Sequence, residues 1–316
     1  MTEEATAPQG DPEWRSAGER GSVFAIKALV VFTTMFGRWP ARFVLVFVAF
    51  YYTLLSGRAR RSVHDVRRRL GLETGFWKAY RHILRFAQTA LDALFFLRGR
   101  SSKFDVTHNG HEHLVDLRRN GQSAILLGAH LGSFYAMRGK SAAASLPLHP
   151  VVYTKNARRF NDVLDALDPN STVRLIEIGD GGDIQFMLKI REKLDDGALV
   201  AILADRLQPG AKTVTVDFLG GQAELPAGPY ILASMLKCPV YFTAGIYRGG
   251  NRYELYCVPF ADKIKLPRGD RASGVAAYAQ QYADQVAALL REAPENWFNF
   301  YDFWAPSEGP ESVPPE

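Results

Sequence analysis

The sequence predicts an α/β protein with a mixed, mostly parallel sheet flanked by helices and preceded by an N-terminal apolar helical segment. From residue 103 onward, strand-like and helix-like segments alternate, which is typical of this class. The segments "SAILLGAH" and "ALVAILAD" are nearly continuous apolar runs, as expected of parallel strands covered by helices on both sheet faces. The segment "PVYFTAGIYRGGNRYELYCVPF" has a glycine-rich turn between two strand-like runs, which predicts a hairpin and therefore a mixed sheet.

The composition is that of a globular protein. The chain has 316 residues, of which 47% are hydrophobic and 22% charged, enough for a large core in one large or two small domains. Cys238 and Cys257 both lie in apolar, strand-like stretches, which predicts small core residues in a reducing compartment. The net charge of +5 suits nucleic acid, an anionic membrane surface or an anionic cofactor, so the position of the charge along the chain must decide among them.

The N-terminal region is the most apolar part of the chain. Residues 1–21 are polar, lack the pattern of a secretory signal peptide, and are expected to be a disordered tail. The apolar run Phe43–Leu55 is shorter than the roughly 20 residues that span a bilayer core. We therefore predict two short apolar helices around the break "GRWPAR", forming a hairpin on or in a membrane. A buried core helix and a single spanning helix are the alternatives.

A dense basic block, "GRARRSVHDVRRRLG", follows directly. Arginines beside an apolar segment are attracted to anionic lipid, by about 1 kcal/mol per nearby charge. A nucleic-acid site requires a basic groove with stacking aromatic residues or a known motif, and the sequence shows neither. We therefore predict an anionic membrane surface as partner and no nucleic acid; a solvated helix face is the alternative.

The remaining elements follow in order. The segment 75–97 is an amphipathic helix with aromatic residues on its apolar face. Strands are predicted at 103–110, 123–130, 147–155, 173–179, 198–205 and 213–220 and in the hairpin 239–260. Helices are predicted at 111–121, 157–167, 182–197, 228–238 and 271–291, before the aromatic segment "NWFNFYDFW".

His130 is the first candidate catalytic residue. It follows a buried strand and precedes a helix-compatible tail, so it is expected at the carboxyl edge of the sheet, where α/β enzymes bind ligands. Gly128 and Gly132 permit a tight turn there, and backbone N–H groups that follow could bind an anion. A lone histidine in apolar surroundings is more often structural, so its partners decide its role.

Asp205 and Arg206 end a second apolar strand. An acid and a guanidinium at a strand edge suit an oxyanion, phosphate or carboxylate site, and a surface ion pair is the alternative. The segment "FLGGQAELPAGP" predicts a glycine- and proline-rich loop that brings its backbone close to a ligand before a helix N-terminus at Gly228.

Three further histidines, in "THNGHEHL", suggest a metal site at first sight. The spacing of His108, His111 and His113 matches no i, i+4 pair on a helix face, and no cysteine lies nearby to complete a tetrahedral set. We therefore expect no metal.

Taken in order, several motifs carry a resemblance to a known family: Gly110 to Leu114, "ILLGAHLGSF", "YTKN", "ILADR", "FLGGQAELPAGP" and "NWFNFYDFW". They resemble the bacterial lipid A biosynthesis (lauroyl/myristoyl) acyltransferases, within the lysophospholipid acyltransferases, over most of the chain. The resemblance implies an enzyme at the cytoplasmic face of a bacterial inner membrane, without a cofactor. It would move a fatty acyl chain from an acyl carrier protein or coenzyme A thioester to a hydroxyl, or an amine, of a glycolipid or lysolipid.

The resemblance also implies roles for single residues. His130 would be the general base, and Asp205 and Arg206 would bind an acceptor phosphate or shape the site. Lys155, Asn156 and Gly228 are further candidate substrate-binding residues. The implied organisation is a tail at 1–21, a membrane-associating apolar and basic segment at 22–70, the α/β acyltransferase domain at 71–305, and a disordered tail at 306–316.

Tyr135 departs from the family pattern. The family motif has Asp or Glu five residues after the histidine, and this carboxylate orients the imidazole and stabilises the imidazolium. A phenol is uncharged at neutral pH, so about 10⁴-fold in rate is at stake by analogy with a catalytic triad. Three explanations follow: another carboxylate such as Asp205 or Glu177, a more nucleophilic amine acceptor, or a relative that binds acyl lipids without turnover.

Overall fold

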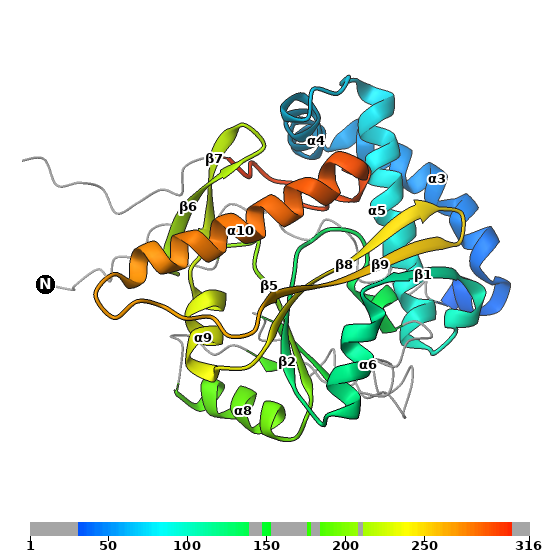
Figure 1. The fold of residues 1–316 in the computed structure, drawn as a ribbon. Coiled ribbons are helices and arrows are strands. Elements are labelled where there is room, and N and C mark those ends of the chain that lie inside the picture. The colour runs from blue at the N-terminus through cyan, green and yellow to red at the C-terminus, as the bar shows by residue number, and fades with distance from the viewer. Residues whose placement is uncertain (1–30, 139–146, 153–175, 178–183, 208–210, 305–316) are drawn as a thin grey trace, which may run out of the picture.

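The computed structural model describes residues 31–138, 147–152, 176–177, 184–207 and 211–304 (Figure 1). Seven strands within these ranges form one mixed sheet in the order β1-β9-β8-β2-β5-β3-β4. Their bounds are β1 Asp105–Asn109, β2 Ala124–Gly128, β3 Leu148–Val152, β4 Ile176–Glu177, β5 Leu199–Leu203, β8 Val240–Gly249 and β9 Arg252–Ala261.

The pairing in this sheet confirms the predicted mixed, mostly parallel arrangement. Strand β2 lies between β5 and β8 and is parallel to both, whereas β8 and β9 form the predicted antiparallel hairpin. All five residues of β2 are buried, as expected of a central strand covered on both faces. Alternate residues of β2 point to opposite faces, so Ile125 and Leu127 enter one core and Ala124 and Leu126 the other.

Helices cover both faces of the sheet (Figure 1). The larger core packs α8, α9 and α10 against one face, and a second core packs α3, α5 and α6 against the other. The bounds of the helices are α3 Arg38–Leu55, α4 Gly57–Arg69, α5 Phe76–Leu97, α6 His111–Arg119, α8 Ile184–Asp195, α9 Gly228–Leu236 and α10 Arg271–Glu292, with short 3₁₀ turns η1 Ser101–Lys103, η2 Phe134–Arg138 and η4 Pro294–Asn296.

The N-terminal helices break at Gly37, the first residue of the predicted break, and a second time at Ser56. The chain is helical at 31–36, breaks at Gly37 with a φ of 86°, and continues as α3. Pro40 lies in the first turn of α3, where a missing N–H costs nothing, so it does not interrupt the helix. The pair α3 and α4 is bent by 92°. In the described part of the chain no single helix is long and apolar enough to cross a membrane, and only this bent pair together reaches the required length and composition.

The basic block forms α4, which is part of the folded body. Val66 of α4 lies in the larger core, and the Ser62 hydroxyl donates a hydrogen bond of 2.8 Å to the Asn299 carbonyl oxygen. Arg61 and Arg68 lie on the exposed face. The helix is thus bound through one face and presents charge on the other.

The segment before Gly228, predicted as a ligand-binding loop, contains a β-strand in the structure. Residues Gly221–Pro226 form β7, which pairs antiparallel with β6 (Thr213–Phe218) in a separate hairpin. The composition concealed this strand, because glycine and proline are rare in strand interiors. Here Pro226 is the last residue of its strand, and β6 and β7 form a two-stranded ribbon separate from the main sheet.

Both cysteines are free thiols, Cys257 in the core and Cys238 half-buried. Several predictions fall outside the described residues: both tails, the helix at 157–167, and the sites at Lys155 and Asn156.

Candidate active site

The candidate site forms where two neighbouring parallel strands end. Gly128, the last residue of β2, is in register with Leu203, the last residue of β5. His130 and Asp205 each come two residues after these positions. Because carboxyl ends of parallel strands meet at one edge of the sheet, the two side chains are brought together across 75 residues of sequence.

His130 and Asp205 make two hydrogen bonds. The ring Nδ1 of His130 lies 2.9 Å from Asp205 Oδ1, and the backbone N–H of His130 donates to Asp205 Oδ2 at 2.9 Å. A carboxylate only accepts, so Nδ1 carries the proton and Nε2 keeps its lone pair. The His130 side chain is 27% exposed, whereas that of Asp205 is 1% exposed. The ring therefore has a fixed tautomer and an edge that a substrate can approach.

Asp205 is held in its charged form. Burial opposes ionisation of this carboxyl group, but His130, Arg206 and Asn299 outweigh burial and lower its pKa to about 2. The side chain is thus an anion throughout the physiological pH range. An imidazolium formed beside it would be stabilised.

Asn299 completes the surroundings of the carboxylate, and sequence reasoning missed it. Its side-chain Nδ2 donates to Asp205 Oδ2 at 2.8 Å, and its Oδ1 accepts from Arg206 Nε at 2.7 Å. Arg206 also donates from Nη2 to the Phe298 carbonyl at 3.2 Å. The signal was present, because Asn299 is a polar residue inside the aromatic run "NWFNFYDFW" and is 1% exposed. Buried amides require partners.

The loop after His130 is closed by the same C-terminal segment. The Phe298 N–H donates to the His130 carbonyl at 2.8 Å, and the Gly132 N–H donates to the Asn296 carbonyl at 2.8 Å. Gly132 has a φ of 68°, and a Cβ there would collide with the backbone oxygen of Gly245. Only glycine can adopt this positive φ and allow this close approach of the Gly245 backbone without strain.

Tyr135 does not take the place of the motif carboxylate at the ring. It lies in the 3₁₀ turn η2, packs beside Phe134 and the smaller core, and makes no hydrogen bond to His130 among the described contacts. Burial raises the pKa of its phenol, so it stays neutral. The predicted helix after His130 is this short turn.

The other predicted site residues are placed as follows. Gly228 is the first residue of α9. Two residues later, the pKa of the Tyr230 phenol is raised by burial and, to a smaller extent, by the nearby Asp205 carboxylate. Glu177 ends β4, and its side chain is outside the described atoms. Of the predicted residues, the structure thus brings together His130, Asp205 and Arg206.

A family model described as bacterial lipid A biosynthesis acyltransferase matches residues 87–305. The chain belongs to this family. It has no significant match among curated proteins. The match covers the sheet, the second half of α5, the helices from α6 to α10 and the segment with Asn299, and it confirms the predicted family and enzyme class.

This acyltransferase therefore acts in lipid A biosynthesis. The family implies an acyl donor and a lipid A precursor as acceptor, in bacteria and typically at the inner membrane.

Proposed function

We propose that this acyltransferase transfers a fatty acyl chain from a thioester to a hydroxyl of a lipid A precursor, with His130 as general base and Asp205 as its carboxylate partner. The observation that carries the proposal is the contact of 2.9 Å between His130 Nδ1 and Asp205 Oδ1. Asp205, which follows the end of β5, thus supplies the negative charge that the family motif places at position 135. Of the three explanations for Tyr135, it favours a carboxylate from elsewhere.

In the proposed reaction, His130 Nε2 removes the proton from the acceptor hydroxyl while that oxygen attacks the thioester carbonyl carbon. The imidazolium that forms is paired with the Asp205 carboxylate at Nδ1. When the tetrahedral intermediate collapses, the C–S bond breaks and the thiolate takes the proton back from Nε2. The products are an ester and a free thiol, and His130 is neutral again.

Arg206 has two proposed roles. Its Nε and Nη2 hold Asn299 and the Phe298 carbonyl, which positions the amide that bonds Asp205. Its Nη1 makes no hydrogen bond in the described structure, so it is proposed to bind an acceptor phosphate. Lys155, Asn156 and Gly228 remain proposed substrate-binding residues. The donor, an acyl carrier protein or coenzyme A thioester, is anionic and complements the net charge of +5.

We place the reaction at the cytoplasmic face of the inner membrane. The two free thiols suit a reducing compartment, and both donor types are found there.

The test is acyl transfer from a labelled thioester to a lipid A precursor by the wild type and four variants. We expect His130→Ala and Asp205→Asn to lower kcat by about 10²- to 10⁴-fold, because they remove the base or its counter-charge. Tyr135→Phe should retain activity within a few-fold of wild type. Circular dichroism would show that all variants are folded.

Two results would overturn the proposal. One is an Asp205→Asn variant as active as wild type. The other is turnover that appears only in Tyr135→Glu, which would support the alternative of a relative that binds acyl lipids without turnover.

A further inference from the structure

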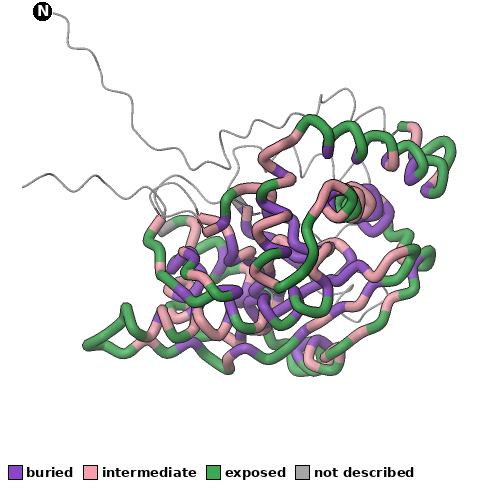
Figure 2. The backbone as a smooth tube through the Cα atoms, turned by 90° about the horizontal axis from the view of Figure 1, so that it is seen from above, coloured by how far each residue is buried: buried purple, intermediate pink, exposed green. Residues whose placement is uncertain are grey.

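Helix α3 has an outward face that is apolar along its whole length. Large apolar side chains recur there at intervals of three or four residues, which places them on one side of the helix. Trp39, Phe43, Phe47 and Tyr51 are each 60–67% exposed, and Leu54 and Leu55 continue the stripe. The alternation of exposed and buried residues along the chain can be followed in Figure 2. So large an exposed apolar patch marks an interaction surface.

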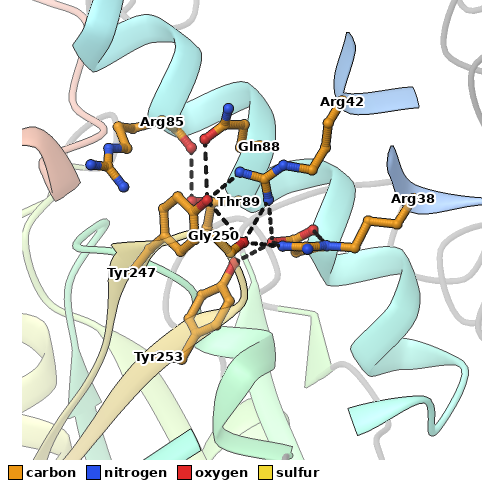
Figure 3. Close-up of polar contacts among 9 residues, drawn as sticks. Arg38, Arg42, Arg85, Gln88, Thr89, Tyr247, Gly250 and Tyr253 are labelled. Atoms are coloured by element: carbon orange, nitrogen blue, oxygen red, sulfur yellow. Dashed lines mark hydrogen bonds and ion pairs between the residues drawn. The ribbon is translucent and has the colours of Figure 1, made fainter. Parts of the chain in front are cut away.

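The opposite face of α3 is bound to the body by buried charges, which we call the arginine latch (Arg38, Arg42 and Asp92). Figure 3 shows Arg38 and Arg42 reaching from α3 toward Gly250. Arg38 makes two hydrogen bonds to the Asp92 carboxylate of α5, at 2.6 and 2.7 Å, and Arg42 a third at 3.2 Å. Both arginines also donate to the Gly250 carbonyl in the β8–β9 turn. All three latch side chains are less than 10% exposed.

The latch restricts how α3 meets a bilayer. An upright, spanning α3 would take α5, packed along it, into the hydrocarbon. That would carry Arg81, Arg85 and Gln88 of α5 with it, at a cost of several kcal/mol for each charge. The bend of 92° into the basic α4 opposes an upright helix as well. A helix lying flat puts only the apolar stripe in lipid.

We propose that α3 lies parallel to the membrane, with the stripe sunk into one leaflet that contains anionic lipid and the arginine latch facing the body. Interfacial helices of this kind sink about 5–10 Å. Arg61 and Arg68 on the exposed face of α4 complement anionic headgroups, and Trp77, 65% exposed, suits the interface. The inference deepens the proposed function, on which it rests for the lipid nature of the acceptor.

This placement would also fix the site relative to the lipid. Helix α4 follows α3 after one residue, and its Ser62 bonds the backbone of Asn299, whose side chain holds Asp205. Helix α5 packs against both α3 and η2, the turn that follows His130. Described contacts therefore connect the stripe to the catalytic pair on two sides.

The test measures depth in the bilayer at three positions of α3. Fluorescent labels are attached to Trp39→Cys, Phe47→Cys and Leu54→Cys, each in the full chain with Cys238→Ser. Cys257 stays in place, because it is buried and burial raises the pKa of its thiol to about 12. The vesicles contain phosphatidylethanolamine, phosphatidylglycerol and a lipid brominated at a shallow or a deep acyl position.

We expect shallow bromine to quench all three labels more than deep bromine does, at similar depths. A matched control, Leu188→Cys on α8, replaces an equally exposed apolar residue (61%) outside the stripe and should not be quenched. A deep label at position 47 between shallow ones at 39 and 54 would show a spanning helix and overturn the inference. Absence of quenching at all three would overturn it too.

The depth measurement needs no donor thioester, so its outcome is independent of catalysis. If the labels showed that α3 does not lie flat while the enzyme remained active, only the membrane placement would be rejected and the proposed function would stand. Conversely, if the enzyme failed the acyl-transfer test but its labels showed the expected depths, the proposed function would be rejected and the flat placement of α3 would stand.

Discussion

At the scale of single residues, His130 has a carboxylate partner although position 135 of the motif holds none. Tyr135 holds the position of the motif carboxylate, yet His130 Nδ1 meets the carboxylate of Asp205 from the adjacent strand. A carboxylate within hydrogen-bond distance of Nδ1 can orient the imidazole and stabilise the imidazolium from any position in the sequence.

Asn299→Leu tests the support of this carboxylate. Loss of one hydrogen bond to a charged group, about 1.5–3 kcal/mol, should lower kcat by about tenfold to a hundredfold. A positioning residue should leave the KM for the thioester unchanged, whereas loss of substrate contact would raise it. Asn251→Ala, in the exposed β8–β9 turn, is the control and should match wild type.

His82 should make the stability of the fold depend on pH. Burial lowers the pKa of His82 to about 4, against about 6.5 in the unfolded chain, although its hydrogen bond to the Trp297 carbonyl opposes this. Between these values the unfolded chain binds more protons, so the unfolding free energy falls as pH falls from 6.5 to 4, by up to about 3 kcal/mol. Denaturant titrations at pH 7 and pH 4.5 would measure it.

The variant His82→Gln keeps an N–H for the Trp297 carbonyl but cannot gain a proton. Its unfolding free energy should therefore change less than that of the wild type between the two pH values. An equal change in both proteins would assign the acid sensitivity to other groups.

At the scale of elements, the loop from His130 to Ser133 is held from two sides. Gly132 bonds the Asn296 carbonyl, and the Ser133 N–H donates to the Gly245 carbonyl at 2.7 Å. The loop is therefore a fixed connection between β2, β8 and the C-terminal segment, although it has no regular structure of its own.

Gly132→Ala tests this packing. It combines a left-handed φ with a collision against the backbone of Gly245, so we expect a loss of at least about 3 kcal/mol in unfolding free energy. Gly121→Ala is matched, because its φ is 59° and nothing lies within 4 Å of the added Cβ; it should cost about 1 kcal/mol. Equal losses in denaturant titrations would show that φ alone matters.

At the scale of the whole molecule, the arginine latch makes α3 a part of the folded body. Asp92→Asn should cost about 3–5 kcal/mol, because it leaves Arg38 and Arg42 buried without a counter-charge. Asp65→Asn removes the surface ion pairs of α4 with Arg69 and Arg68 and should cost less than about 1 kcal/mol.

Limited proteolysis measures this difference. Cleavage between α3 and α5 should become faster in Asp92→Asn and stay at the wild-type rate in Asp65→Asn. Unchanged cleavage in both variants would mean that apolar packing alone holds α3.

The sequence predicted most elements and three members of the candidate site, His130, Asp205 and Arg206, because these follow from local patterns. Continuous apolar runs locate β2 and β5, and His130 and Asp205 each follow two residues after the end of their strand. Sequence could not show that these strands are neighbours, since pairing across 75 residues depends on the whole topology. Asn299 was missed for the same reason, and β7 because its composition is typical of a turn.

The order in which the chain is synthesised gives the contact between Phe298 and His130 a further meaning. A nascent polypeptide on the ribosome would display His130 and later Asp205 long before residues 296–299 emerge. Until they dock, the histidine loop lacks its partner at Phe298 and the carboxylate lacks its amide from Asn299. An unfinished chain would therefore lack a complete site, and residues 296–299, the last part of the site to be made, would complete it only when the domain is whole.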